Sequence, residues 1–136
     1  MIEKNLLHQV GKTGRAMHAA FEETVGIALP RWRIMLAIHQ NGESAQKDLA
    51  AFLSMDPGLL TRQLKQMEIE GIVKRKSALE DNRITRVQLT AKGTGMVEAA
   101  QPLRQSFFEK ALEGLPTDKL CAAMDILETL EARFRR

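Results

Sequence analysis

The strongest constraint on the fold lies in residues 46–71, where two short helices are predicted to be joined by a tight turn. Asp56 stands at an N-cap position and Pro57 at the first helical position, a combination that starts a helix. A shorter helix is predicted over residues 46–53, just before the turn. The second helix carries one apolar stripe, formed by Leu60, Leu64 and Met67. Two short helices around a three-residue turn, the second with a polar outer face, indicate a helix-turn-helix.

A predicted β-hairpin follows the second helix. Residues 72–76 and 84–89 are two runs of β-forming residues, and the segment between them is polar and charged. A hairpin in this place is called a wing: its stem packs on the helices, while arginines at its tip cannot support a core and are free to reach outward. Residues 30–89 therefore predict a winged helix-turn-helix, in the mainly α (α+β) class.

Long amphipathic helices are predicted on both sides of this winged segment. Apolar residues recur every three to four positions over residues 1–26, over residues 91–113 and from residue 118 onward. Thr117 is expected to cap the last helix, and Pro102 to bend the helix before it or to mark an irregularity there.

These outer helices can pack together within one chain, or they can pack against the same helices of a second copy. We expect the second arrangement, because a small winged module already has its own core and three flanking helices exceed what it needs. Two-fold dimers are also the commonest soluble oligomers. We therefore expect a single domain over residues 1–136, with a DNA-binding lobe at 30–89 and a dimerisation region at 1–28 and 91–136.

The positive charge of the chain is concentrated in its middle third. The formal net charge is +3. Between Gln46 and Gly93 there are nine Lys and Arg and six Asp and Glu, whereas the remaining residues hold eleven of each sign. Such a local excess is typical of a surface that binds a polyanion, although chance alone also produces a difference of three charges.

Composition and motifs narrow the compartment and the chemistry. The one cysteine, Cys121, excludes an internal disulfide, fits a reducing cytosol and is expected to be a buried, inert thiol. No apolar run indicates a signal peptide or a membrane span. The three histidines lack metal-ligand spacing, and no nucleophile elbow, P-loop or dinucleotide-binding glycine motif is present. We therefore expect a cytoplasmic protein with no metal, no cofactor and no enzymatic activity.

Several segments resemble the MarR family of bacterial and archaeal transcriptional regulators. The most specific are Leu60-Thr61-Arg62 in the second helix of the helix-turn-helix, and Asp81-x-Arg83 followed by Leu89-Thr90-x-Lys92-Gly93 in and after the wing. The likeness extends over essentially the full length. It implies a homodimeric winged helix-turn-helix protein that binds a pseudo-palindromic operator in double-stranded DNA, usually as a repressor. Many members are released from DNA by a small molecule, often phenolic or an anionic aromatic.

Two arginines are expected to carry the DNA recognition. The second helix should enter the major groove by its N-terminus, where Arg62 can form two hydrogen bonds to a guanine. The alternative is that Arg62 is a surface arginine paired with an acid. Arg83 should enter a narrow minor groove, and the resemblance implies that Asp81 holds its guanidinium. The alternative is that this charged hairpin tip is only solvated.

The other expected DNA contacts surround these two arginines. Phosphate contacts are expected from Gln46, Lys47, Arg75, Lys76 and Arg86. The complete set of predicted DNA-binding residues is Gln46, Lys47, Pro57, Gly58, Thr61, Arg62, Lys65, Gln66, Lys76, Asp81, Arg83 and Arg86.

The resemblance also implies an effector pocket where the dimerisation helices meet the DNA-binding lobe. Arg15 and His18 lie about one turn apart on the first predicted helix, so both can face one cavity, and an arginine suits a carboxylate. Trp32 suits an aromatic ring, and Arg33 follows it. The simpler interpretation places Trp32 in the core and the other three at the surface or at an interface.

A second class of function is a winged-helix module that binds other proteins and does not bind DNA, since fold alone does not settle function. The basic wing, the polar face of the second helix and the localised charge favour a DNA-binding regulator.

Overall fold

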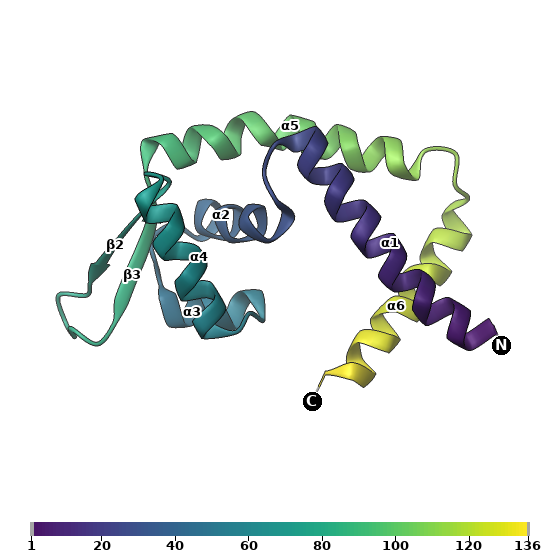
Figure 1. The fold of residues 1–136 in the computed structure, drawn as a ribbon, viewed down its shortest axis with the longest axis horizontal. Helices are drawn as coiled ribbons and strands as arrows, with labels where there is room; N and C mark the ends of the chain where they lie inside the picture. The colour runs from purple at the N-terminus through teal and green to yellow at the C-terminus, as the bar shows by residue number, and fades with distance from the viewer. Residues whose placement is uncertain (1, 136) are drawn as a thin grey trace. The chain divides into compact units, whose positions relative to one another are not determined.

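The computed structural model describes residues 2–135, which form six helices and a small sheet (Figure 1). In chain order the elements are α1 (Ile2–Val25), α2 (Leu29–Asn41), β1 (Ser44–Ala45), α3 (Gln46–Leu53), α4 (Pro57–Ile69), β2 (Val73–Ser77), β3 (Thr85–Leu89), α5 (Ala91–Leu112) and α6 (Thr117–Phe134). The predicted mainly α class with a winged helix-turn-helix is confirmed, and α3, α4 and the β2–β3 hairpin are its parts.

The two helices of the helix-turn-helix begin and end for local reasons. Ser54, directly after α3, adopts the left-handed conformation with φ 53°, which turns the chain sharply. Asp56 then caps α4, because its Oδ2 accepts a hydrogen bond from the backbone N–H of Leu59 at 2.9 Å. Pro57 is the first residue of α4, as predicted.

The sheet has three antiparallel strands in the order β1-β3-β2. β2 and β3 form the predicted wing, with Arg75 opposite Val87. The sequence did not predict β1, whose residues Ser44 and Ala45 pair with Val87 and Arg86. β3 is therefore the central strand, and the outer edge of β2 is free of any strand partner within the described residues.

An apolar core stabilises the winged lobe. The largest fully buried side chains are Trp32, Phe21, Ile34, Met35, Ile38, Leu49, Leu60, Leu64, Met67, Ile72, Val73 and Val87. Each such side chain contributes about 1.5–3 kcal/mol relative to its exposed state. By its internal contacts the chain divides after Gln105, so that this core, α1 and most of α5 belong to the first unit.

The start of α5 is joined closely to the turn between α4 and β2. The Oγ1 of Thr90 donates to the carbonyl oxygen of Gly71 at 2.6 Å and accepts a hydrogen bond from the backbone N–H of Gly93 at 3.1 Å, so Thr90 caps the start of α5. Gly71 has φ 78°, a conformation that glycine adopts without strain. A Cβ on Gly93 would overlap the carbonyl oxygen of Ile72, so only glycine fits at this contact without a shift of the backbone.

The second unit begins at Ser106 and contains the end of α5 and all of α6. The predicted capping by Thr117 is wrong: Pro116 occupies the N-cap in an extended conformation without a side-chain cap, and Thr117 is already helical. The physical reason is that the proline ring fixes φ near the value found before a helix. The predicted burial of Cys121 is also wrong, because α6 buries none of its residues and Cys121 is exposed.

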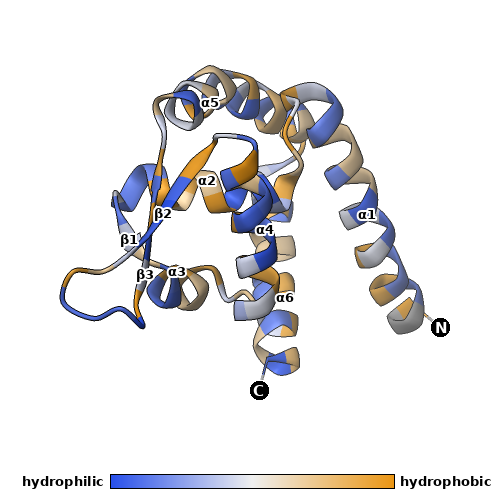
Figure 2. Cartoon of the chain, turned by 60° about the vertical axis from the view of Figure 1, so that its left-hand side comes forward, coloured by the Kyte–Doolittle hydropathy of each residue, from blue (hydrophilic) through white to orange (hydrophobic). Residues whose placement is uncertain are grey.

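Four large apolar residues of α6, Met124, Ile126, Leu127 and Phe134, are exposed in the same way. Figure 2 colours the hydrophobic segments of this helix orange. Among residues 2–135, no helix has the length and apolar content needed to cross a membrane. The described residues also contain no group of three or more His, Cys, Asp or Glu that could hold a metal ion.

Candidate nucleic-acid interface

The outward face of α4 presents the polar side chains that the sequence assigned to base recognition. Arg62, Lys65 and Gln66 are exposed, while the opposite face of the helix is buried in the core. Within residues 2–135 no ion pair holds Arg62 or Lys65. The guanidinium of Arg62 points back toward Gly58 in the first turn, since a Cβ there would lie 3.6 Å from its Nη1. The positive end of α4 and two unpaired cations therefore share one surface.

A side-chain hydrogen bond ties α3 to α4 at this surface. The Nε2 of Gln46 donates to the Oγ1 of Thr61 at 2.7 Å, and this hydroxyl donates in turn to the carbonyl oxygen of Pro57 at 2.9 Å. The hydroxyl proton of Thr61 is consequently engaged inside the protein. The structure brings these two predicted DNA contacts together, and their hydrogen bond links α3 to α4.

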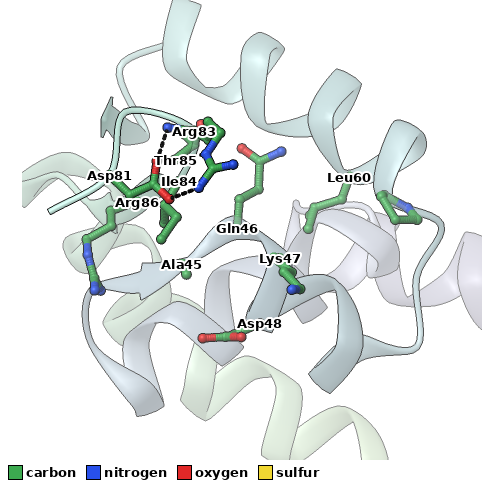
Figure 3. A pocket seen from close by; sticks show the side chains of 11 residues that line it. Ala45, Gln46, Lys47, Asp48, Leu60, Asp81, Arg83, Ile84, Thr85 and Arg86 are labelled. Carbon is green, nitrogen blue, oxygen red and sulfur yellow. Dashed lines mark hydrogen bonds and ion pairs between the residues drawn. The ribbon is translucent and has the colours of Figure 1, made fainter. Parts of the chain in front are cut away.

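The tip of the wing holds one guanidinium in a fixed and fully accessible position. The Oδ1 of Asp81 accepts hydrogen bonds from the backbone N–H of Arg83 at 2.9 Å and from its Nε at 3.1 Å, and the Oδ2 accepts from its Nη2 at 3.0 Å. These bonds lower the pKa of Asp81 below its ordinary value, so the carboxylate stays ionised. The side chain of Arg83 is nevertheless 91% exposed. Figure 3 shows both side chains at the tip, joined by dashed lines.

Two further basic side chains of the wing, those of Arg86 and Lys76, are paired with acids. The Nη2 of Arg86 lies 2.9 Å from the Oε1 of Glu80, and this hydrogen bond lowers the pKa of Glu80. The Nζ of Lys76 lies 3.2 Å from the Oε1 of Glu43, but 64% of the Lys76 side chain is exposed. A phosphate contact from either cation therefore requires it to leave its acid or to share it.

A hollow of about 700 Å³ lies between the wing, the start of α3 and the start of α4 (Figure 3). It is lined by six of the predicted DNA contacts: Gln46, Lys47, Pro57, Asp81, Arg83 and Arg86. The remaining six lie on α4 and on β2. The Oε1 of Gln46 is buried and has no hydrogen-bond partner within residues 2–135. The hollow thus brings together side chains that are distant in the sequence.

None of the four predicted effector contacts lines either of two hollows within residues 2–135, the one beside the wing and the one beside Arg31. Arg15 and His18 are exposed on α1. Trp32 is 1% exposed, with its ring centroid 6.4 Å from that of Phe21, so it belongs to the core. Arg33 is exposed on α2, where its Nη2 donates to the carbonyl oxygen of Leu53 at 3.2 Å.

The sequence did not single out Arg31, which lines a second hollow of about 440 Å³ with Glu22, Gln63 and Met96. Its two terminal nitrogens each donate to a carboxylate oxygen of Glu70 at 2.9 Å. Glu70 stands at the C-terminal end of α4, and the hydrogen bonds from Arg31 lower its pKa. No sequence pattern signals this pair, because its members are 39 residues apart.

Known proteins with similar sequences identify the family to which this chain belongs. The model of the MarR family matches residues 27–85, from the α1–α2 connection to the first residue of β3. The uncharacterized HTH-type transcriptional regulator YdgJ of Bacillus subtilis (strain 168) is 30% identical over 125 residues, which are 92% of this chain and 76% of that protein. The chain belongs to the MarR family. The HTH-type transcriptional repressor IacR of Pseudomonas putida is 26% identical over 91 residues, 67% of this chain and 54% of that protein.

Solved structures of MarR-family proteins share the fold. A crystal structure of a cysteine-to-serine mutant of MarR from E. coli, complexed with operator DNA, has a TM-score of 0.83 at 22% identity and covers 93% of each chain. The organohalide-sensing regulator RdhR in its 2,4-dichlorophenol-bound form has a TM-score of 0.90 at 14% identity, over 98% of this chain and 82% of that chain. MarR-family proteins are transcriptional regulators, and this chain is therefore a DNA-binding regulator.

Proposed function

We propose that this protein is a homodimeric transcriptional repressor that acts in the cytoplasm, binds a pseudo-palindromic operator and is released by a small molecule. The observation that carries the DNA-binding part is the clamp between Asp81 and Arg83. It holds a planar cation at the tip of the wing while leaving it 91% exposed. A narrow, A·T-rich minor groove has an enhanced negative potential that attracts such a side chain.

The recognition helix α4 supports the same proposal. Arg62 is exposed, unpaired within the described residues and close to the positive end of the helix. A bidentate contact from such an arginine to guanine contributes about 1–3 kcal/mol of discrimination. Lys47, exposed at the start of α3, is assigned to a backbone phosphate, which sets the register without reading the sequence.

The exposed apolar residues of the outer helices support a dimer. α1 buries only Phe21 and Val25 among its described side chains, and α6 buries none. The exposed apolar residues of α1, α5, α6 and the connection between α5 and α6 include Leu6, Val10, Met17, Leu103, Leu112, Leu115, Met124, Leu127 and Phe134. A stable monomer rarely exposes so many large apolar side chains, and a second copy offers the same helices as a partner. We therefore assign residues 1–28 and 91–136 to dimerisation and 30–89 to DNA binding.

Repression and release are supported by relatives and by the hollow beside Arg31. IacR is a transcriptional repressor, and RdhR binds 2,4-dichlorophenol. An anionic ligand that drew Arg31 away from Glu70 would loosen the support of the C-terminal end of α4. The earlier candidates Arg15, His18 and Arg33 stay predictions for an effector site formed in the dimer, and the buried Trp32 would serve that site as a wall.

A gel-shift titration with the DNA upstream of the gene that encodes this protein tests the proposal. Arg83→Ala should weaken operator binding by at least about tenfold and leave fold and dimer intact, because the Arg83 side chain makes no core contact. Sedimentation velocity reports the oligomeric state, and circular dichroism reports the fold.

Arg135→Ala is the matched control. Arg135 is also an exposed arginine paired with an acid on its own segment, but it lies at the end of α6, outside the winged lobe. The control removes the same charge and should bind DNA like the wild type. Equal affinities of the wild type and Arg83→Ala at physiological salt would contradict the role of the wing. A monomer in solution would contradict the dimer, and no binding of duplex DNA at low salt would favour the protein-interaction module.

A further inference from the structure

A carboxylate on the recognition helix holds the wing by its outer edge. The Oε2 of Glu68, in the last turn of α4, accepts a hydrogen bond from the backbone N–H of Arg75 at 3.2 Å. Its Oε1 accepts from the Nε and the Nη2 of the same arginine at 3.4 and 3.3 Å. Arg75 is the central residue of β2, so one side chain of α4 contacts both the main chain and the side chain of the wing strand.

The direction of this N–H shows that Glu68 occupies the place of a missing strand. In the β2–β3 ladder, Thr90 donates to Ile72 and Ala78 donates to Ile84. Along an antiparallel strand, residues that are hydrogen-bonded to the partner strand alternate with residues whose N–H and C=O point the other way. Arg75 is of the second kind, so its N–H points away from β3 toward the free edge of the sheet. An unpaired edge N–H is a liability, and here the carboxylate of Glu68 satisfies it.

The contact between Glu68 and Arg75 also spans the junction between α4 and the wing, where the wing could rotate. α4 ends at Ile69 and β2 begins at Val73, so a short turn that contains Gly71 joins the two elements (Figure 1). Glu68 and Arg75 stand on opposite sides of that turn, and their contact fixes the direction in which the hairpin leaves the helix. The Arg75 side chain is 19% exposed, which shields the contact from solvent on one side.

We infer that Glu68 is a positioning residue for DNA recognition. By setting the angle between α4 and the wing, it lets Arg83 reach the minor groove while α4 occupies the major groove. This inference rests on the proposed function of the wing. Glu68 touches no DNA in this role and acts only through Arg75 and β2.

The sign of the effect separates positioning from simple electrostatics. Removing an acid from a DNA-binding lobe raises its positive charge, so charge alone predicts that Glu68→Ala binds every duplex more tightly. Positioning predicts weaker binding of the operator, because the major-groove and minor-groove contacts no longer form together. Binding to a scrambled duplex depends little on this geometry and should be unchanged or stronger.

A double-mutant cycle with Arg83 provides the decisive measurement. The probes are an operator duplex obtained by selection from genomic fragments and a scrambled duplex of equal length and composition. Arg83→Ala should weaken operator binding by about tenfold or more in the wild-type background and by about threefold or less in the Glu68→Ala background. Glu68→Ala alone should weaken operator binding by about fivefold or more.

Glu43→Ala is the matched control. Glu43 also pairs with a basic residue of β2, but through a single contact to the exposed Lys76 and without a backbone hydrogen bond. It removes the same charge, and it should bind the operator at least as tightly as the wild type and keep the full Arg83 effect. If circular dichroism shows that Glu68→Ala is unfolded, Glu68→Gln replaces it, because the amide keeps an acceptor for the N–H but loses the ion pair.

The outcomes distinguish this inference from the proposed function. An Arg83 effect of full size in every folded Glu68 variant overturns the inference and leaves the proposed function intact. An Arg83 effect that is absent already in the wild-type background overturns the proposed function of the wing. A reduced Arg83 effect in the Glu68 variants but not in Glu43→Ala supports the positioning role.

Discussion

Replacing Gly93 by alanine probes the contact between the start of α5 and the turn that ends the recognition helix. Gly93 is buried in the first turn of α5. An added Cβ would overlap the carbonyl oxygen of Ile72 and would lie 3.0 Å from the Cδ2 of Leu89. The backbone must shift to relieve the overlap, because a carbonyl group of the main chain cannot rotate away as a flexible side chain can.

Gly95, two residues further along α5, provides a reference for the size of the effect of Gly93→Ala on stability. It is exposed, and a Cβ there would meet no atom within 4 Å. Gly95→Ala should therefore stabilise the fold by about 0.5–1 kcal/mol, the ordinary gain of alanine over glycine in a helix. Gly93→Ala has the same gain, but it also carries an overpacking penalty of about 1–3 kcal/mol. The difference between the two variants isolates that penalty.

Urea unfolding at a fixed protein concentration, followed by circular dichroism, measures this difference. We expect the midpoint of Gly95→Ala to lie above that of the wild type and the midpoint of Gly93→Ala to lie below that of Gly95→Ala, with similar slopes. Equal stabilities of the two variants would refute the reasoning, because they would mean that α5 does not touch the turn as closely as the structure has it.

Three further predictions concern recognition, capping and pH. Arg62→Ala should relax base preference in a selection experiment, whereas Lys47→Ala should weaken all sequences alike and flatten the dependence of affinity on salt. Asp56→Ala should lower the free energy of unfolding by about 0.5–2 kcal/mol in a urea titration, because α4 loses its N-cap. The pKa of Glu70 is lowered from 4.5 by its hydrogen bonds to Arg31, so its contribution is present above pH 4.5 and is lost as the pH falls through the lowered folded-state value. Wild-type protein should therefore lose more stability than Glu70→Gln between about pH 5 and pH 3 in parallel urea titrations, and equal losses would contradict this pair.

The sequence predicted those parts of the fold that local signals determine. The bounds of α3 agree with the expectation, and Asp56 and Pro57 start α4 as predicted, because capping and proline geometry act within a few residues. β1 was missed because two residues carry no periodicity. The cap of α6 was misassigned because Thr117 and Pro116 both suit the position, and only the backbone decides between them.

In the candidate site, too, the local contacts could be predicted from the sequence and the contacts between separate elements could not. The clamp between Asp81 and Arg83 spans two residues and could be expected from the motif. The contacts of Glu68 with Arg75 and of Arg31 with Glu70 could not, since each joins separate elements and depends on how the helices and the hairpin meet. Trp32 is buried in the core and the other three predicted effector contacts are exposed on α1 and α2, so this set stays a prediction.

The engaged hydroxyl proton of Thr61 limits what this side chain can read in a groove. With its proton given to Pro57 and one lone pair taken by Gln46, it has no hydrogen left to offer to N7 or O6 of a purine. What it still presents is one lone pair, which can accept from the amino group of adenine or cytosine, and a methyl group, which suits the 5-methyl of thymine. A contact of Thr61 to thymine would then be made by the methyl group alone, and serine, which keeps the hydroxyl but lacks the methyl, would lose that contact.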